Sequence, residues 1–232
     1  MAKLLLKDKL AAQHVYLILA GLFIASLVVS NLIFQKFFSW DFFGLYTFEI
    51  SVGILPYPVT FLITDIISEI YGKKKANQVV TTGIFASFFS LLIIYTADAV
   101  PATEWSPIGD ALFTQVFGAT TIAVFASMVA YLLAQYIDIH LFHFWKRLTK
   151  GKHLWLRNNF STFLSQFVDT FSVLFLLCSF NKIEWDLFGA LLLSGFLFKV
   201  IVAALDTPLL YASVFAFRKR FKLKQGEELK YD

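Results

Sequence analysis

Long apolar segments constrain this chain more than any other feature of its sequence. A helix needs roughly 20 consecutive apolar residues to cross the hydrocarbon core of a bilayer. Of the 232 residues, 58% are hydrophobic and 18% are aromatic, which is more than a soluble domain carries. Segments of sufficient length occupy residues 14–34, 42–70, 76–97, 111–145, 158–180 and 185–217. We therefore predict an all-α integral membrane protein, a bundle of six transmembrane helices.

Basic residues gather in alternate connections between these segments and predict their orientation. The basic groups are Lys3, Lys7 and Lys9, then Lys73, Lys74 and Lys75, then Lys146, Arg147, Lys150, Lys152 and Arg157, and finally Arg218, Lys219, Arg220, Lys222 and Lys224. The positive-inside rule places these connections and both termini in the cytoplasm. The chain then divides into a cytoplasmic N-terminus (1–13), one membrane domain (14–217) and a basic cytoplasmic tail (218–232).

Several segments exceed the length of a simple span, so we expect long or broken helices. Pro56-Tyr57-Pro58 interrupts the second segment and Pro208 interrupts the sixth. Proline lacks the amide donor and disfavours helix at the preceding residue. Broken backbone at membrane depth is tolerated where it lines a cavity. Pro58 and Pro208 are therefore candidates for a gating role, with a simple packing kink as the alternative.

The fifth segment carries a polar stripe along one face of the predicted helix. Thr162, Ser165, Gln166, Asp169 and Thr170 follow one another at helical spacing. An aspartate at the centre of a membrane helix costs roughly 2.5 to 3.5 kcal/mol. The stripe must therefore face protein or water rather than lipid.

Acidic residues in three other segments lie at a comparable depth. Asp65, Asp138 and Asp206 join Asp169 in a layer between the midplane and the cytoplasmic boundary. Lys199 is the cation available inside the sixth segment. It either pairs with Asp169 or Asp206 and only holds helices together, or it neutralises a carboxylate and shifts its proton affinity as substrate or ion comes and goes. Glu69 lies one turn beyond Asp65, either as a solvated helix end or in a secondary role at the site.

Several classes of function find no support in the sequence. His140, His143 and His153 lack a set of metal-ligating partners and are interpreted as interfacial side chains. The common hydrolase motifs and a phosphate-binding loop are absent from the sequence. The net charge of +4 comes from the cytoplasmic loops rather than from a nucleic-acid surface. We expect no cofactor, no metal and no nucleic-acid partner, and an intramembrane enzyme with paired carboxylates remains a minor alternative.

Several short stretches, taken together and in order, resemble one protein family. They are Pro56–Thr60, Asp65, Glu69–Lys73, Ala126–Tyr131, Gln135, Asp138, Arg157–Thr162, Ser165, Gln166, Asp169, Thr170, Lys199 and Leu205–Pro208. The chain is similar at these positions to the bacterial queuosine precursor transporters, also called the vitamin uptake transporter family. The resemblance implies import of 7-cyano-7-deazaguanine, or of its aminomethyl relative, across the cytoplasmic membrane for tRNA queuosine synthesis.

The polar layer and the resemblance together predict a binding site. A carboxylate can accept two N–H groups from the edge of a guanine-like base. The predicted substrate-binding residues are Asp65, Tyr131, Gln135, Asp138, Asn159, Gln166, Asp169, Lys199 and Asp206, with Glu69, Pro58, Pro208 and Ser165 in gating or secondary roles. The coupling ion is left open, and lipid or a second copy of the chain is expected against the aromatic helix faces. The alternative function is a membrane-embedded binding subunit that needs a separate ATPase.

Overall fold

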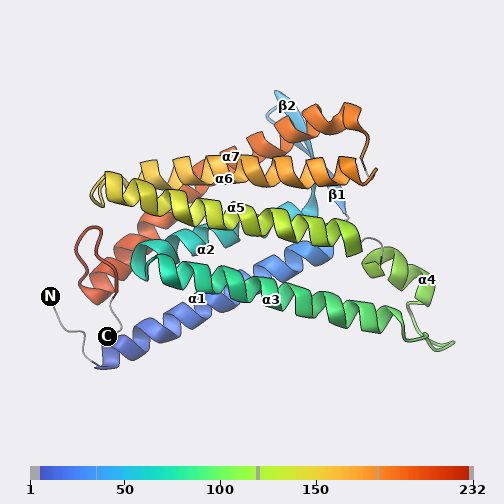
Figure 1. Cartoon of the computed structure of the whole chain (residues 1–232), viewed down its shortest axis with the longest axis horizontal. Coiled ribbons are helices and arrows are strands. Elements are labelled where there is room, and N and C mark those ends of the chain that lie inside the picture. Colours follow the sequence, from blue (N-terminus) through green and yellow to red (C-terminus); the bar gives the residue numbers. More distant parts are fainter. Residues whose placement is uncertain (1–5, 35, 119–120, 182, 230–232) are drawn as a thin grey trace.

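The computed structural model describes residues 6–34, 36–118, 121–181 and 183–229 as a helical bundle with one short hairpin (Figure 1). The elements follow the chain in the order α1 (Leu6–Ile33), β1 (Phe37–Phe42), β2 (Tyr46–Ser51), a 3₁₀ turn η1 (Val52–Ile54), α2 (Tyr57–Ile70), α3 (Lys73–Asp98), α4 (Asp110–Phe113), a π-helical turn η2 (Thr114–Gly118), α5 (Thr121–Leu148), α6 (Leu154–Ser179) and α7 (Trp185–Phe221).

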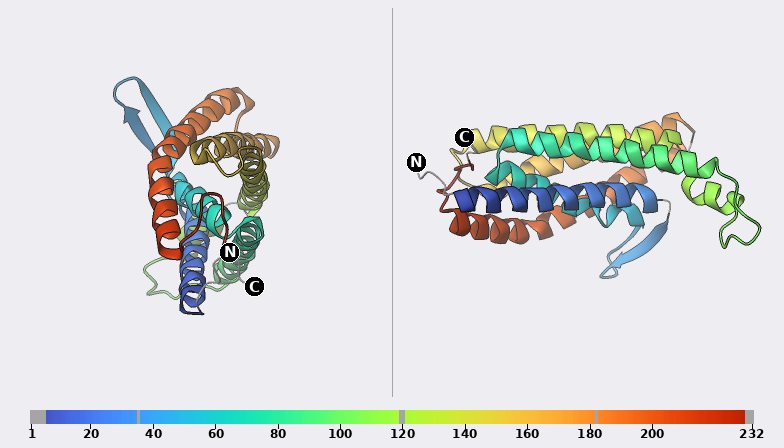
Figure 2. Two further views of the ribbon diagram at one scale, coloured as in Figure 1. Left: turned by 90° about the vertical axis from the view of Figure 1, so that its left-hand side faces the viewer. Right: turned by 90° about the horizontal axis from the view of Figure 1, so that it is seen from below.

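The long helices run along one axis and alternate in direction, as Figure 1 shows. The shorter helix α2 lies inside the bundle, enclosed by α1, α3, α5 and α7 (Figure 2). From Thr60 to Ile70 only Leu62 on this helix escapes full burial. Helix α2 is therefore the central element, and it holds Asp65 and Glu69 in the interior.

Five of the described helices are long and apolar enough to cross a membrane. They cover Lys7–Ile33, Val52–Ile70, Lys73–Asp98, Leu154–Ser179 and Trp185–Phe221. Their exposed faces are rich in Leu, Ile and Phe, which is what lipid requires. The chain is thus a multi-pass membrane protein.

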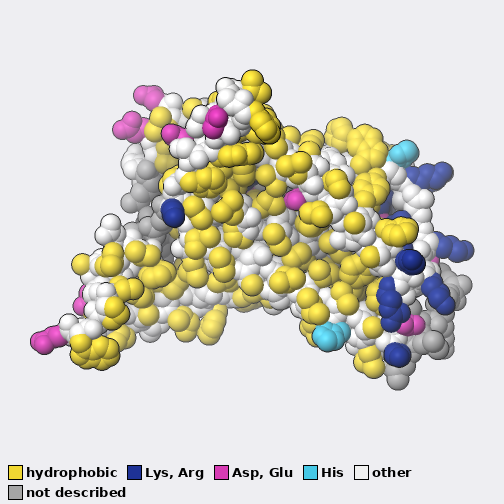
Figure 3. All heavy atoms as spheres, turned by 180° about the vertical axis from the view of Figure 1, so that it is seen from behind, with side chains coloured by type: hydrophobic (Ala, Val, Ile, Leu, Met, Phe, Trp, Pro, Cys, Tyr) yellow, Lys and Arg dark blue, Asp and Glu magenta, His cyan; other side chains and the backbone are white. Residues whose placement is uncertain are grey.

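Charged side chains divide between the two ends of this apolar body. Figure 3 shows Lys and Arg concentrated at one end, whereas acidic side chains dominate the opposite end. The basic end contains the start of α1, the turns α2–α3 and α5–α6, and the end of α7. We call it the basic end below.

Residues 42–51 form part of a β-hairpin, so the expected helix over residues 42–70 is wrong in its first part. Strands β1 and β2 pair antiparallel, with Phe37 opposite Ser51 and Phe42 opposite Tyr46. Aromatic and β-branched residues favour strands, and this segment is rich in both. Gly44 supplies the left-handed backbone of the turn, with φ of 70°.

The prolines mark the start of α2 rather than an interruption within a helix. Pro56 is the N-cap and Pro58 lies in the first turn, where amide donors have no helical partner in any case. The hairpin before them packs on α7, where the rings of Trp40 and Phe48 lie 5.5 and 6.0 Å from that of Phe198. The hairpin is therefore anchored to the bundle.

Two further expectations about the helices are corrected. The segment 111–145 is divided, because α4 and η2 precede α5 as separate turns. Helix α7 continues through Pro208, so the predicted break there is wrong. One proline removes a single helical hydrogen bond, and the helix bends instead of ending (Figure 2).

Candidate functional site

A cavity opens beneath the hairpin, on the side away from the basic end. Its volume is about 250 Å³, near the lower end of the range for small-molecule pockets. Most of its wall is apolar, and the polar groups gather at few positions. Those positions are Ser30, Asn31, Glu49, Ser51, Tyr57, Tyr131, Asp169, Thr170 and Lys199. We call this space the outer cavity.

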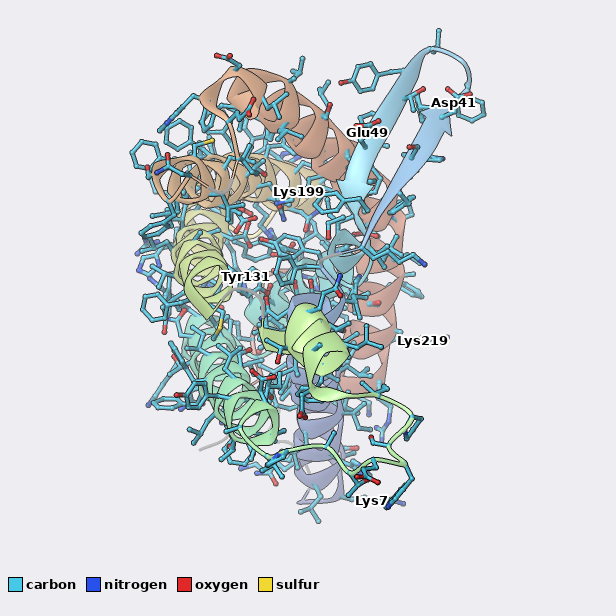
Figure 4. All side chains as sticks on the ribbon, turned by 90° about the vertical axis from the view of Figure 1, so that its right-hand side faces the viewer. Lys7, Asp41, Glu49, Tyr131, Lys199 and Lys219 are labelled. Carbon is cyan, nitrogen blue, oxygen red and sulfur yellow. The ribbon has the colours of Figure 1, made fainter. Side chains whose placement is uncertain are left out.

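An ion pair lies at the floor of the outer cavity. Lys199 Nζ on α7 is 2.6 Å from Asp169 Oδ2 on α6, and the two side chains are only 11% and 4% exposed. In Figure 4 Lys199 and Tyr131 both point into the space enclosed by the helices, with Glu49 on the hairpin nearby. The structure therefore pairs Lys199 with Asp169 rather than with Asp206.

Aromatic rings complete the floor beside this ion pair. Lys199 Nζ is 4.5 Å from the centroid of the Tyr57 ring, a cation–π distance. The rings of Tyr57 and Tyr131 lie 5.2 Å apart. The Tyr57 hydroxyl faces the Asp169 side chain, yet neither this hydroxyl nor Asp169 Oδ1 has a hydrogen-bond partner of good geometry. The floor thus offers an acceptor, a hydroxyl and two ring faces to a solute.

A second, smaller cavity lies on the other side of Tyr57 and Lys199, toward the basic end. Its volume is about 20 Å³, room for about one water molecule, and polar groups from α2, α6 and α7 line it. These groups are Tyr57, Asp65, Asn158, Thr162, Gln166, Lys199 and Asp206. Tyr57 and Lys199 line both spaces, so they form the partition between the outer cavity and this inner cavity.

Two buried aspartates lie on the contacting helices α2 and α5, and one of them, Asp65, lines the inner cavity. Asp138 is fully buried. The Ser165 hydroxyl donates to Asp138 Oδ1 at 3.0 Å. Ser165 is thus a support for Asp138, and it is buried away from solvent.

Gln135 belongs to a hydrogen-bond chain behind the floor of the outer cavity. Thr64 Oγ1 donates to Gln135 Oε1 at 3.3 Å, and Gln135 Nε2 donates to the Tyr131 hydroxyl at 2.6 Å. Both ends of the Gln135 amide therefore have partners within the protein. This arrangement orients Tyr131, whose ring lines the outer cavity.

Asn159 lies apart from both cavities in the contact between α6 and α7. Its Nδ2 donates to Thr207 Oγ1 at 3.1 Å and to the Trp155 carbonyl at 2.8 Å. The neighbouring Asn158 lines the inner cavity instead. The sequence contained a signal for this, because Asn158 precedes Thr162 and Asp169 by four and eleven residues and so continues the polar stripe.

Glu69 is fully buried at the basic end, so its interpretation as a solvated helix end is wrong. Its Oε2 lies 2.6 Å from Arg157 Nη2 and 3.4 Å from Lys146 Nζ, and its Oε1 contacts Arg218 Nη2. These basic residues were assigned to cytoplasmic loops from sequence alone. They lie instead in the end turns of α5, α6 and α7, where Arg157 is fully buried, so the cluster joins these helices to α2.

The C-terminal segment folds back onto the same cluster. The Leu229 amide donates to the Ile70 carbonyl at 2.7 Å, and Glu228 Oε1 accepts from Lys146 Nζ at 2.9 Å. A side chain at Gly72, where φ is 83°, would meet the Glu228 carboxylate. The described part of the tail therefore packs against the basic end of the bundle.

Known proteins match this chain over most of its length. Residues 51–213 match the family described as "Putative vitamin uptake transporter". The "Probable queuosine precursor transporter" of Bacillus subtilis (strain 168) is 28% identical over 175 residues, which cover 75% of this chain and 74% of that protein. The "Queuosine precursor transporter" of Escherichia coli (strain K12) is 30% identical over 131 residues, or 56% of this chain and 55% of that protein. No solved structure matches.

Proposed function

Since this chain belongs to the vitamin uptake transporter family, we propose that it imports queuosine precursors across the bacterial cytoplasmic membrane. Both named relatives carry the description queuosine precursor transporter. The substrates proposed are 7-cyano-7-deazaguanine and its 7-aminomethyl relative. The protein moves them unchanged and is not an enzyme.

The observation that carries this proposal is the ion pair of Asp169 and Lys199 inside the membrane domain. Charged groups in a membrane helix are expensive and are kept mainly where they serve a pathway. Here they lie at the floor of an open cavity, with Asp169 Oδ1 unpartnered. An unpartnered hydrogen-bond acceptor in a largely apolar pocket favours recognition of a small polar solute.

The proposed topology has six spans, formed by α1, η1 with α2, α3, α5, α6 and α7. The alternating directions of these helices and the basic end support it. The basic end then faces the cytoplasm, together with residues 6–13 and 218–229. The outer cavity faces the opposite side of the membrane, from which an import substrate arrives.

A guanine-like base fits the groups at the floor of the outer cavity. Its N1–H and exocyclic amine are donors that a carboxylate accepts side by side, and Asp169 provides that carboxylate. Tyr57 and Tyr131 offer ring faces to the bicyclic base. Passage to the inner cavity then requires Tyr57 and Lys199 to move, after which Asn158 and Gln166 become accessible.

Uptake of labelled 7-cyano-7-deazaguanine into proteoliposomes that contain only this protein tests the proposal. We expect substrate-specific entry with the purified protein, and loss of at least tenfold in Asp169→Asn. Asp186→Asn is the matched control, because Asp186 lies exposed in the first turn of α7. The amount of folded protein is compared by size-exclusion chromatography.

The same assay separates the alternatives. Entry that occurs only after an ATPase is added would favour the binding-subunit function over a self-sufficient carrier. Chemical change of the recovered substrate would reveal an enzyme. Wild-type rates in folded Asp169→Asn would show that the assigned site is wrong.

A further inference from the structure

The inner cavity has room for about one water molecule or one small ion, and oxygen-bearing side chains from three helices line it. They are Asp65 on α2, Asn158, Thr162 and Gln166 on α6, and Asp206 on α7. We infer that these five residues form a binding site for a monovalent metal cation, sodium, whose gradient drives import. The coupling to import rests on the proposed transport function, whereas the ion site rests on the cavity alone.

Two buried oxygen atoms on the wall of this cavity have no hydrogen-bond partner among the described residues. They are Thr162 Oγ1 and Gln166 Oε1, and both residues are 4% exposed. A helical threonine commonly bonds its own backbone, as Thr170 does by donating to the Gln166 carbonyl at 2.9 Å. Buried polar atoms without partners are costly, so a ligand that both oxygens can coordinate would stabilise the folded protein.

Helical spacing brings the α6 residues to the same wall. Asn158, Thr162 and Gln166 follow one another at intervals of four residues, so they occupy successive turns of one helix face. Asp65 and Asp206 line the cavity from α2 and α7. The wall therefore combines two carboxyl groups with amide and hydroxyl oxygens, a set of donors that suits a metal cation with several ligands.

The two acids at this cavity lack cationic partners. Among the residues that the structure describes, no lysine, arginine or histidine forms an ion pair with Asp65 or Asp206. Lys199 also lines the cavity, but its Nζ lies 2.6 Å from Asp169 Oδ2. Acidic side chains at membrane depth are expensive unless they are paired or serve an ion pathway. A bound cation would supply the missing positive charge.

The size of the cavity and its donor atoms favour sodium over other ligands. Carboxylate and carbonyl oxygens suit hard cations, and no sulfur or imidazole lines the cavity to favour a transition metal. Magnesium keeps several of its waters and calcium takes six to eight oxygens, more than a space for about one water holds. A proton would need only a carboxyl group and would leave Thr162 Oγ1 and Gln166 Oε1 without a ligand.

Tyr57 and Lys199 line both cavities and thereby connect the ion site to the substrate site. A sodium ion in the inner cavity repels the Lys199 ammonium and so changes the strength of its pair with Asp169. Sodium binding therefore alters the affinity of the outer cavity for its solute. Because such coupling is reciprocal, bound substrate alters the affinity for sodium by the same factor.

Thermal unfolding of the purified, substrate-free protein in detergent tests the ion site. Sodium chloride replaces choline chloride stepwise at constant ionic strength, with potassium chloride as a parallel series. We expect the melting temperature to rise saturably with sodium and at least tenfold more weakly with potassium, because a ligand of the folded state stabilises it by mass action. Asp65→Asn should abolish this rise.

A threonine variant separates ion binding from a structural role. Thr162→Val keeps the volume of the side chain and removes the unpartnered hydroxyl. We expect at least tenfold weaker apparent affinity for sodium, with no loss of stability in choline chloride. Thr82→Val is the matched control, because its exposed hydroxyl on α3 donates to its own helix at the Gln78 carbonyl, and it should respond to sodium like the wild type.

Uptake into proteoliposomes tests the coupling. Labelled 7-cyano-7-deazaguanine is offered with an inward sodium gradient, with an inside-alkaline pH gradient, or with neither, and we expect accumulation above equilibrium only with sodium. A melting temperature insensitive to sodium, wild-type sodium affinity in folded Thr162→Val, or accumulation without a sodium gradient would each overturn the inference. Stabilisation by sodium without entry of the precursor under any gradient would instead overturn the proposed transport function.

Discussion

The two buried ionic clusters of this protein differ in how many partners each acid has. At the basic end, the Glu69 carboxylate meets Arg157, Lys146 and Arg218 and is fully buried. At the cavity floor, Asp169 pairs with one cation, Lys199, and its Oδ1 has no hydrogen-bond partner of good geometry. The first cluster joins α2, α5, α6 and α7, whereas the second joins only α6 and α7.

This difference distinguishes an ionic cluster that stabilises the fold from a surface that can bind a solute. A buried carboxylate surrounded by cations holds helices together and leaves little capacity for a solute. A carboxylate with a free oxygen beside an open cavity has that capacity, at the expense of a less satisfied folded state. The Glu69 cluster therefore holds the helices together at the basic end, whereas Asp169 faces the outer cavity.

The largest effect is expected at the basic end. Glu69→Gln removes the carboxylate that three cations share and leaves Arg157 buried without its ionic partner. Breaking one partner of a buried ion pair costs about 3–5 kcal/mol. Thermal unfolding in detergent should show the loss as a large fall in melting temperature. If the melting temperature falls no more than it does in the exposed control Asp186→Asn, the Glu69 cluster does not stabilise the bundle.

A smaller loss is expected at the cavity floor. Lys199→Met leaves Asp169 without its cation, but water in the outer cavity can solvate the carboxylate. The free energy of unfolding should therefore fall by about 3 kcal/mol, the lower end of the range for broken buried ion pairs. The double variant Lys199→Met, Asp169→Asn should recover part of this loss, because residues in contact do not act additively. Strict additivity in the same unfolding assay would show that the two charges are not coupled.

An intermediate loss is expected when the hydrogen bond from Ser165 to Asp138 is removed. Ser165→Ala removes a donor 3.0 Å from Asp138 Oδ1 and should cost about 1–2 kcal/mol. Ser179→Ala on the same helix is the matched control, because its hydroxyl is exposed and bonds only its own helix. Equal melting temperatures for the two variants would contradict the assigned contact.

The smallest effect is expected on the surface of the basic end. Arg220 lies 2.8 Å from Asp8, but its side chain is 54% exposed. Exposed pairs contribute roughly 0–1 kcal/mol and are screened by salt. Arg220→Ala should therefore leave unfolding nearly unchanged at high ionic strength. A loss of stability comparable to that of Glu69→Gln would show that buried and exposed ion pairs at this end contribute equally.

Some of the site followed from sequence because helical spacing and the cost of charge in lipid act locally. The polar stripe of α6 had to face inward, and Asp169 and Gln166 do so. A lysine inside a membrane helix predicts an acidic partner, and Lys199 has one. The sequence could not identify that partner, because Asp169 and Asp206 were both compatible with the spacing along the chain.

Other features depended on contacts between distant segments. Tyr57 gave no polar signal of its own, yet the packing of α2 places its ring between the two cavities. Residues 42–51 were apolar enough for a helix, but the cross-strand pairing of β1 and β2 and their packing on Phe198 favour a hairpin. Apolar composition alone does not distinguish a short buried strand from part of a helix.

The sequence by itself determined that this chain enters the membrane, how its charges divide between the two ends, and which helix face carries acids inward. These properties depend on transfer of single side chains into lipid and on helical periodicity. The tertiary structure decided that Glu69 pairs with three cations and that Lys199 pairs with Asp169 rather than with Asp206. Such pairings depend on how separate helices pack, because the energy of two charges depends on their distance in space rather than along the chain.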